Sequence, residues 1–341
     1  MALEPHSQTS EAKDDRALSG SSLGTGSWQK RSIQTLLKEA GVAIDGPNPW
    51  DIHVRDERFY DAALRDGELG VGESYAAGWW DCEQLDELTG RILSHDLLRR
   101  VGRGWRTLWA TFKHKLLNLQ TENRATQVAW AHYDRSNEFF QQMLGPTMSY
   151  SCAYWRNADC LDKAQHDKHD LICRKLGVKK NDRVLDIGCG WGGFAKHAAQ
   201  NYGCHVTGIT ISRAQHEFAR GFCANLPVDI VFGDYRGDLL RSMGPFDKIV
   251  LIGMFEHVGG SNHRQCLAIA HELLKDDGLF LLQVIGGSTS CGFGAWIDRY
   301  IFPNGELPSL SDLVGSLRDL YVMEDWHNFG ADYSASCGGT V

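Results

Sequence analysis

The stretch VLDIGCGWGGFA, Val184–Ala195, joins a short apolar run, interrupted by one aspartate, to a cluster of glycines. The apolar run is typical of a buried strand, and the glycines permit a sharp turn from that strand into a helix. From residue 178 onward, further apolar runs alternate with amphipathic segments; the runs are RVLDIGC, HVTGIT, VDIVFGD, FDKIVLIGM and GLFLLQVIG. This alternation predicts an α/β fold with a doubly wound parallel sheet of five strands.

The glycine loop fits two ligand-binding patterns. Gly188, Gly190 and Gly193 match G-x-G-x-x-G, the dinucleotide fingerprint. Asp186 with Gly188, Gly190 and Gly192 matches D-x-G-x-G-x-G, the S-adenosylmethionine loop. A carboxylate two residues before the first glycine repels a pyrophosphate but attracts the ammonium of a methionine. The dinucleotide pattern also needs an acid at the end of the second strand, where this chain reads TGITIS. The loop therefore favours S-adenosylmethionine; a purely structural turn would not need that acid.

Polar residues follow the second and third predicted strands. Thr210, Ser212 and Gln215 stand where most methyltransferases carry an acid for the ribose hydroxyls. Asp234 and Tyr235 are placed to meet the adenine. Ordinary turns use the same residue types, so this prediction depends on their joint position at the carboxyl ends of strands, where ligands of such sheets bind.

Several motifs resemble the cyclopropane-fatty-acyl-phospholipid synthases, with the mycolic acid cyclopropane synthases as near relatives. In order they are HYDRSNEFF, YSCAYW, VLDIGCGWGG, ITISRAQ, MFEHVG, YIFPNGELPS and EDWHNFGADY. The resemblance runs from residue 33 to residue 333 and includes LGVGESYAAGWWDC, a motif of the phospholipid-modifying branch. It implies a class I S-adenosylmethionine-dependent methyltransferase of Rossmann-like fold with a small N-terminal α+β domain.

The resemblance also implies a reaction and its residues. A methylene passes from S-adenosylmethionine to the cis double bond of a phospholipid acyl chain. The resulting carbocation loses a proton to bound bicarbonate as the ring closes. By resemblance, Tyr133, Tyr150 and Ser151 contact the cofactor. The residues that by resemblance surround the bicarbonate are Cys152, Glu256, Gln283, Ile285 and Tyr333.

A carbocation needs a dry pocket with electron-rich walls, and an aromatic face stabilises a desolvated cation by about 2 kcal/mol or more. Tyr150, Tyr154, Trp155 and Phe255 are candidates for that lining, with plain core packing as the alternative. Two neighbouring anions repel, so we expect a shared proton or a raised pKa within the cluster around the bicarbonate. We expect His257 to be a structural hydrogen-bonding residue rather than a base.

Two departures from the family pattern bear on activity. Gln283, in QVIG, stands where many relatives read HTIG; glutamine donates a hydrogen bond but does not titrate. The chain ends in SASCGGTV, without helical periodicity, where the family continues with further helices, so we expect a truncated catalytic domain. A lipid C-methyltransferase making methyl-branched or methylene chains, and an inactive truncated isoform, therefore stay as alternatives.

Composition limits the function further. The 341 residues carry a formal net charge of −8, which argues against general nucleic-acid binding. No apolar run reaches the roughly 18 residues that span a bilayer, and the N-terminus resembles no signal or transit peptide. The ten cysteines form no C-x-x-C pair, so we expect free thiols, no metal site and a cytoplasmic location.

Four parts are predicted: a disordered tail (1–28), a small N-terminal domain (29–96), a basic amphipathic linker helix (97–125) and the catalytic domain (126–341). In the small domain, SIQTLLKEAGVAI predicts a helix, DIHV predicts a strand, and LGVGESYAAGWWDC predicts a glycine- and aromatic-rich turn.

The linker helix has an apolar face bordered by basic residues. The apolar residues are Trp105, Leu108, Trp109, Phe112 and Leu116, and the basic ones are Arg103, Arg106 and Lys113. Such a helix either lies in a membrane interface or packs on the protein with solvated charges. Because the implied substrate is an acyl chain in a bilayer, we expect peripheral contact with the inner face of the membrane. Relatives with the N-terminal domain also suggest a homodimer.

Overall fold

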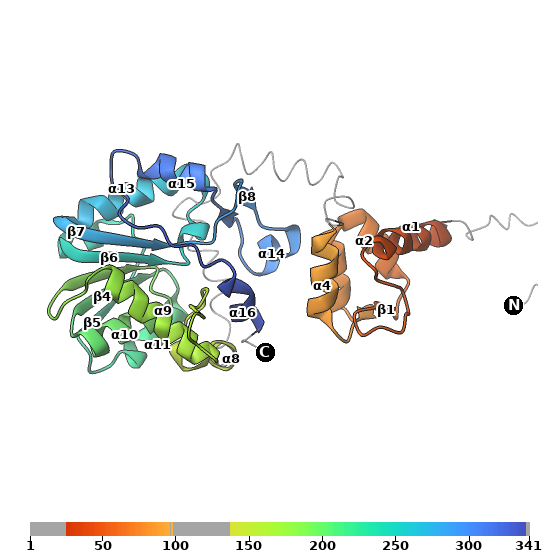
Figure 1. The fold of residues 1–341 in the computed structure, drawn as a ribbon, viewed down its shortest axis with the longest axis horizontal. Coiled ribbons are helices and arrows are strands. Elements are labelled where there is room, and N and C mark those ends of the chain that lie inside the picture. The colour runs from red at the N-terminus through yellow and green to blue at the C-terminus, as the bar shows by residue number, and fades with distance from the viewer. Residues whose placement is uncertain (1–24, 96, 98–136, 339–341) are drawn as a thin grey trace, which may run out of the picture. The chain divides into compact units, whose positions relative to one another are not determined.

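The computed structural model describes residues 25–95, 97 and 137–338, which belong to two compact units, 1–104 and 105–341 (Figure 1). The expected basic helix around Trp105–Leu116 and the expected cofactor contact Tyr133 lie outside the described residues. The helix α1 begins at Thr25, so the last residues assigned to a disordered tail are helical instead.

In its described part, the N-terminal unit combines the helices α1–α4 with a two-stranded sheet. Its elements are α1 (Thr25–Glu39), β1 (His53–Val54), α2 (Arg58–Asp66), α3 (Glu68–Ala76), β2 (Trp80–Asp81) and α4 (Leu85–Ser94). The strands β1 and β2 are antiparallel, with Val54 opposite Trp80. Buried side chains of α1, α2, β2 and α4, including Ile33, Phe59 and Leu88, form one core.

The stretch LGVGESYAAGWWDC is mostly helical, so its prediction as a turn is wrong. Its first part lies in α3, and the turn is confined to Ala77–Gly78 before β2. A Cβ atom at the buried Gly70 would lie 2.0 Å from the main-chain oxygen of Ala62. This glycine therefore allows α3 to pack closely on α2 and does not mark a turn.

The second unit is built on a parallel sheet, which confirms the predicted α/β class (Figure 1). The strands are β3 (Arg183–Ile187), β4 (His205–Thr210), β5 (Val228–Phe232), β6 (Phe246–Ile252) and β7 (Leu274–Gln283). Their order is β5-β4-β3-β6-β7, and every neighbouring pair is parallel. The chain leaves β3 toward β4 and later returns on its other side as β6. The loops after β3 and β6 therefore diverge at a switch point, where ligands of such sheets bind.

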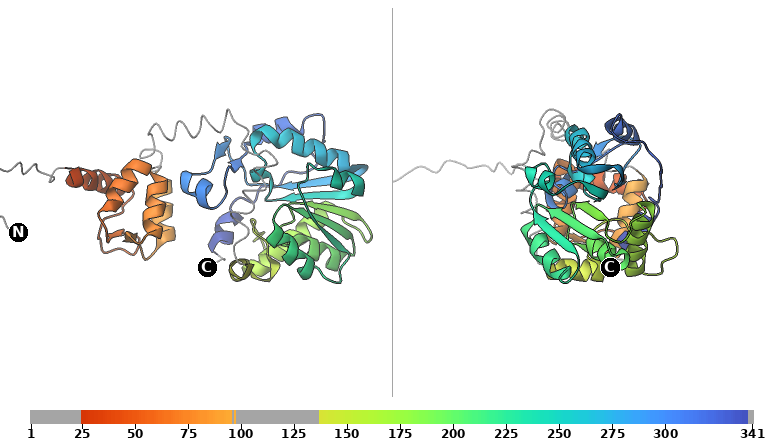
Figure 2. Two further views of the ribbon diagram at one scale, coloured as in Figure 1. Left: turned by 180° about the vertical axis from the view of Figure 1, so that it is seen from behind. Right: turned by 90° about the vertical axis from the view of Figure 1, so that its left-hand side faces the viewer.

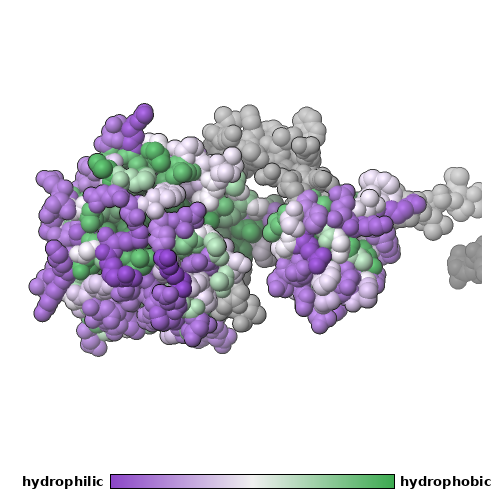
Figure 3. Space-filling model, viewed as in Figure 1, coloured by the Kyte–Doolittle hydropathy of each residue, from purple (hydrophilic) through white to green (hydrophobic). Residues whose placement is uncertain are grey.

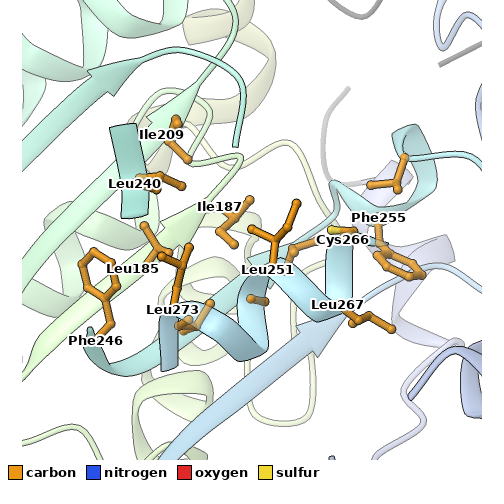
Figure 4. Close-up of a cluster of buried hydrophobic side chains, with 14 of the residues drawn as sticks. Leu185, Ile187, Ile209, Leu240, Phe246, Leu251, Phe255, Cys266, Leu267 and Leu273 are labelled. Atoms are coloured by element: carbon orange, nitrogen blue, oxygen red, sulfur yellow. The ribbon is translucent and has the colours of Figure 1, made fainter. Parts of the chain in front are cut away.

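Helices cover both faces of this sheet (Figure 2). Leu185 and Ile187 point to one face and pack in a cluster with Leu267 of α13 (His263–Leu273) (Figure 4). Val184 points to the other face and packs with side chains of α9 (Leu161–Lys175) and α10 (Gly193–Tyr202). Each fully buried side chain of this kind contributes about 1.5–3 kcal/mol. This alternation along β3 explains why its sequence is apolar on both sides.

The remaining elements lie around the sheet. They are α8 (Asn137–Leu144), η1 (Gly145–Thr147), α11 (Arg213–Phe222), α12 (Asp238–Met243), η2 (Phe255–His257), η3 (Gly260–Asn262), β8 (Cys291–Gly292), α14 (Ala295–Tyr300), β9 (Glu306–Leu307), α15 (Leu310–Leu317) and α16 (Asp332–Gly338). Apolar side chains reach the surface over α15, where Leu310 and Val314 are exposed (Figure 3). Within the described parts of both units, no helix has the length and apolar character needed to cross a membrane.

The segment SASCGGTV begins inside α16, so its first residues are helical although the segment has no helical periodicity in its sequence. Ser336 accepts hydrogen bonds from the amide of Ala153 (3.0 Å) and the indole of Trp155 (2.9 Å). Asp332 accepts a bond of 2.8 Å from the amide of Trp155. Two polar anchors one turn apart hold this helix, and such a helix needs no apolar periodicity in its sequence.

Candidate functional site

The glycine loop turns the chain from β3 into α10. Gly188 and Gly192 have φ of 78° and 85°, which L side chains rarely adopt. A Cβ atom at Gly193 would lie 2.2 Å from the main-chain oxygen of Thr147, so this glycine allows the loop to contact η1 closely. The amide of Gly188 donates a 3.0 Å hydrogen bond to the oxygen of Ile209, which fixes the loop beside β4.

A cavity of about 200 Å³ lies against this loop. It brings together most of the predicted cofactor contacts: Tyr150, Ser151, Asp186, Gly188, Gly190, Thr210, Ser212, Gln215, Asp234 and Tyr235. Gly192 does not line it; a Cβ there would point at the Sγ atom of Cys223 from 3.1 Å. The role of Gly192 is therefore to turn the chain, and we call this space the cofactor cavity.

Asp186 lies at the base of the cofactor cavity and is buried. Burial raises the pKa of its carboxyl to about 7, and the charge of Lys168 works in the opposite direction. A ligand ammonium beside Asp186 would favour the carboxylate form. The residue thus fits the ammonium of S-adenosylmethionine.

The other end of the cofactor cavity holds side chains that are already paired. Thr210 donates a 2.8 Å hydrogen bond to Oε1 of Gln215. Arg236 donates to Asp234 through Nε (2.8 Å) and Nη2 (2.5 Å). A carboxylate held from one side keeps a fixed orientation, and it retains lone pairs for a donor such as an adenine amino group.

A much larger groove, about 2250 Å³, adjoins the cofactor cavity. Its apolar lining comes from β7, α15 and the segment 320–330. All the residues expected around bicarbonate line it: Cys152, Glu256, Gln283, Ile285 and Tyr333. The two spaces share one wall, made of Ser149, Tyr150, Ser151, Lys168, Gly253 and His257. We call the larger space the apolar groove and these six residues the shared wall.

Three buried oxygens of residues that line the apolar groove have no hydrogen-bond partner among the described residues. They are Oε2 of Glu256, Oε1 of Gln283 and Oε1 of Gln165. The opposite atoms are engaged: Oε1 of Glu256 accepts from the amide of Ile285 (2.7 Å), and Nε2 of Gln283 donates to the oxygen of Cys152 (2.9 Å). Burial raises the pKa of Glu256. A small ligand with a hydroxyl group could donate a hydrogen bond to one of these acceptors, and bicarbonate is such a ligand.

Of the four aromatic residues expected to line the carbocation pocket, only one lines the cofactor cavity or the apolar groove. Tyr150 is part of the shared wall, and its ring lies 5.8 Å from that of Phe302. Phe255 is fully buried and stacks on His263 at 4.2 Å, so its prediction as a lining residue is wrong. Tyr154 and Trp155 line neither space and pack near the end of the chain instead.

Sequence reasoning missed one group of site residues on α9. Gln165 and His169 are buried and bonded to the segment 149–151, and Lys168 between them belongs to the shared wall. Their spacing of three and four residues places them on one helix face. That spacing was readable in the sequence. His257, which we expect to be a structural hydrogen-bonding residue, is part of the shared wall, and its ring lies 5.3 Å from that of Phe302.

The described residues were compared with the ligand sets that metal ions require. Across the described residues, no group of three or more His, Cys, Asp or Glu side chains is arranged to hold an ion. The nine cysteines whose side chains are described are all free thiols.

Known proteins resemble this chain in sequence and fold. The family model described as "Mycolic acid cyclopropane synthetase" matches residues 120–337. Cyclopropane-fatty-acyl-phospholipid synthase of Escherichia coli (strain K12) is 45% identical over 307 residues, 90% of this chain and 79% of that protein. Sphingolipid C9-methyltransferase A of Emericella nidulans is 34% identical over 285 residues, 77% of this chain and 54% of that protein.

The solved structure of mycolic acid cyclopropane synthase CmaA1 complexed with SAH and CTAB has a TM-score of 0.57 and 30% identity. The match covers 63% of this chain and 81% of that chain. The fold, the glycine loop and the sequence similarity all indicate the same family. This chain belongs to the cyclopropane synthase family of S-adenosylmethionine-dependent methyltransferases, which includes the mycolic acid cyclopropane synthetases and the cyclopropane-fatty-acyl-phospholipid synthases.

Proposed function

We propose that this protein transfers a methylene from S-adenosylmethionine to the cis double bond of unsaturated phospholipid acyl chains and so forms a cyclopropane ring. The observation that carries the proposal is the shared wall, where the cavity beside the glycine loop meets a much larger, mainly apolar groove. A methyl donor and an acyl chain bound on the two sides meet at Tyr150 and Ser151. The names of the Escherichia coli relative and of the CmaA1 complex support the same assignment.

S-adenosylmethionine supplies an electrophilic methyl group on a sulfonium. Asp186 would hold its ammonium, and Thr210, Gln215, Asp234 and Tyr235 would surround its nucleoside. The apolar groove would exclude water from the alkene, which protects the cationic state that follows methyl transfer. The Tyr150 ring in the shared wall offers that cation an electron-rich face.

Bicarbonate is proposed as the proton acceptor, and the chain's own residues fit it. Glu256 and Gln283 each offer a buried oxygen that lacks a partner among the described residues. Cys152, the amide region of Ile285, and Tyr333 complete the surroundings. Since burial already raises the pKa of Glu256, a proton shared between its carboxyl and the bound anion removes the repulsion between them.

Contact with the membrane follows from the proposed substrate. An acyl chain in a bilayer must reach the apolar groove, and the exposed Leu310 and Val314 over α15 offer apolar surface beside it. We propose a peripheral enzyme on the inner face of the membrane, with the residue ranges 29–96 and 126–341 as its N-terminal and catalytic domains.

The test uses purified protein, labelled S-adenosylmethionine, bicarbonate and vesicles of unsaturated phospholipid. Mass analysis of the released fatty acids should show a gain of one methylene with loss of the double bond. Incorporation into lipid should depend on added bicarbonate. A protein that binds S-adenosylhomocysteine but leaves the fatty acids unchanged would refute the proposed activity.

A second candidate is a lipid C-methyltransferase that makes methyl-branched or methylene chains. The similarity to a sphingolipid C9-methyltransferase and the non-titrating Gln283 favour it. The same mass analysis separates the two, because a methylene branch or a methyl branch fragments differently from a ring. If Gln283 determines the product, Gln283→His should raise the fraction of ring product in the lipid.

A further inference from the structure

Lys168 is a buried cation in the shared wall. Its side chain projects from α9, and the residue is 1% exposed. Its Nζ donates a 2.8 Å hydrogen bond to Oγ of Ser151, its one acceptor among the described residues, and no described carboxylate forms an ion pair with it. An ammonium has three N–H donors, and a buried charge is costly unless it is paired. Two of the three N–H donors of this ammonium therefore have no acceptor among the described residues.

The position of Ser151 does not depend on Lys168. Nε2 of Gln165 donates to the main-chain oxygens of Ser149 (3.2 Å) and Ser151 (2.9 Å). A ring nitrogen of His169 lies 3.1 Å from Oγ of Ser149. The segment is thus held from both sides of Lys168 without its charge, so holding this segment does not by itself explain a lysine here.

Burial lowers the pKa of Lys168 to about 7, while the nearby Cys152 and Asp186 act in the opposite direction. His169 is the other titratable group close to it. At neutral pH the amine is therefore balanced between its two forms. An anion that binds beside it shifts that balance to the ammonium.

We propose that Lys168 is an anion-binding residue of the shared wall, whose ammonium receives a small carboxylate-type anion next to Ser151. The inference rests on the proposed function, which brings two such anions to this wall. One is the carboxylate of the methionine moiety in the cofactor cavity, and the other is bicarbonate in the apolar groove. In either place the ammonium offsets the repulsion between the bound anion and the nearby carboxylate of Asp186.

Calorimetry on Lys168→Met tests the inference without turnover. The calorimetric probes are S-adenosylhomocysteine and 5′-methylthioadenosine, which lacks the carboxylate. Binding of bicarbonate is measured separately, as the rise that it causes in the melting temperature of the protein. The matched control is Lys163→Met, which removes an exposed lysine of the same helix that pairs with Asp167. Loss of a charge-assisted hydrogen bond lowers affinity by about ten- to a hundredfold.

If the anion is the cofactor's carboxylate, Lys168→Met lowers the affinity for S-adenosylhomocysteine by about ten- to a hundredfold. Its affinity for 5′-methylthioadenosine stays within twofold of that of the unaltered protein. If it is bicarbonate, the variant loses the thermal stabilisation by bicarbonate and binds both nucleosides normally. A folded variant that matches Lys163→Met with all three probes overturns the inference.

The unaltered protein gives a second measurement that does not depend on how the variant folds. Titration at about pH 8 in two buffers of different ionisation enthalpy should show proton uptake with S-adenosylhomocysteine or with bicarbonate, but not with 5′-methylthioadenosine. No uptake with either anion overturns the inference. Binding of neither anion overturns the proposed function as well, whereas normal anion binding without any lipid product contradicts only the proposed function.

Discussion

The main-chain amide of Ile285 donates a 2.7 Å hydrogen bond to Oε1 of Glu256, and this bond turns the other carboxylate oxygen, Oε2, toward a place with no partner among the described residues. The two residues come from the loops after β6 and β7, on neighbouring strands of the sheet. Main-chain geometry therefore fixes the orientation of the one carboxylate in the apolar groove that the proposed reaction uses.

Glu256→Gln should remove turnover and spare cofactor binding. The amide keeps the shape but carries no charge, and it cannot share a proton with a bound anion. Loss of a general acid–base group costs on the order of 10²-fold or more in rate. Affinity for S-adenosylhomocysteine should stay within twofold, because Glu256 does not line the cofactor cavity. Glu217→Gln, at an exposed position of α11, is the control and should change neither quantity. Retained turnover in Glu256→Gln would remove this residue from the mechanism.

Asp186→Asn should bind no cofactor yet unfold less easily at alkaline pH. The folded pKa of Asp186 is raised from 3.8 to about 7. The folded state therefore holds this proton more tightly than the unfolded state does. The stabilisation is complete below about pH 4 and is lost as the pH rises to about 7. Asparagine avoids that loss, which amounts to at most about 4 kcal/mol for this shift.

The measurement is urea unfolding of both proteins at about pH 4 and about pH 8. The free energy of unfolding of Asp186→Asn should exceed that of the unaltered protein at the higher pH only. Equal differences at the two pH values would show that Asp186 is not a buried carboxyl of raised pKa. A substitution at a functional site commonly raises the stability of the protein while it removes binding.

Gly193→Ala should disturb the glycine loop, whereas Gly221→Ala should not. The new Cβ at Gly193 would lie 2.2 Å from the main-chain oxygen of Thr147, so η1 or α10 must shift. We expect a loss of about 1–3 kcal/mol in stability and at least tenfold weaker binding of S-adenosylhomocysteine. Gly221 lies in α11 with nothing within 4 Å of its Cβ position, and alanine there should stabilise by about 0.5–1 kcal/mol. Similar effects at both positions would contradict the packing role of Gly193.

The cofactor half of the site follows from local sequence pattern. In a parallel sheet every strand ends at the same edge, so Asp186, Thr210 and Asp234 had to converge once β3, β4 and β5 were recognised. The strands themselves were readable because buried parallel strands are continuously apolar. This part of the prediction required no knowledge of how distant segments pack.

The other half depends on packing that the sequence does not display. Gln165, Lys168 and His169 lie among other polar residues of α9, such as His166 and Asp167, and periodicity alone does not show which polar face is buried. Phe255 directly precedes Glu256, yet the 3₁₀ turn η2 sends its ring onto His263 and into the core. Neighbours in sequence thus point to opposite sides of the loop.

Ser336→Ala should loosen α16 from the segment that carries Cys152. The hydroxyl of Ser336 accepts hydrogen bonds from the amide of Ala153 and the indole of Trp155, and alanine leaves both donors unpaired. A buried donor without a partner costs about 1–3 kcal/mol, so amide exchange of Ala153 and Trp155 should accelerate at least fivefold. Turnover should fall as well, because Tyr333 on the same helix lines the apolar groove. Ser334→Ala, at an exposed position of α16, should leave exchange and turnover unchanged. If Ser336→Ala exchanges no faster than this control, the helix is held by other contacts and its polar anchors do not explain its fold.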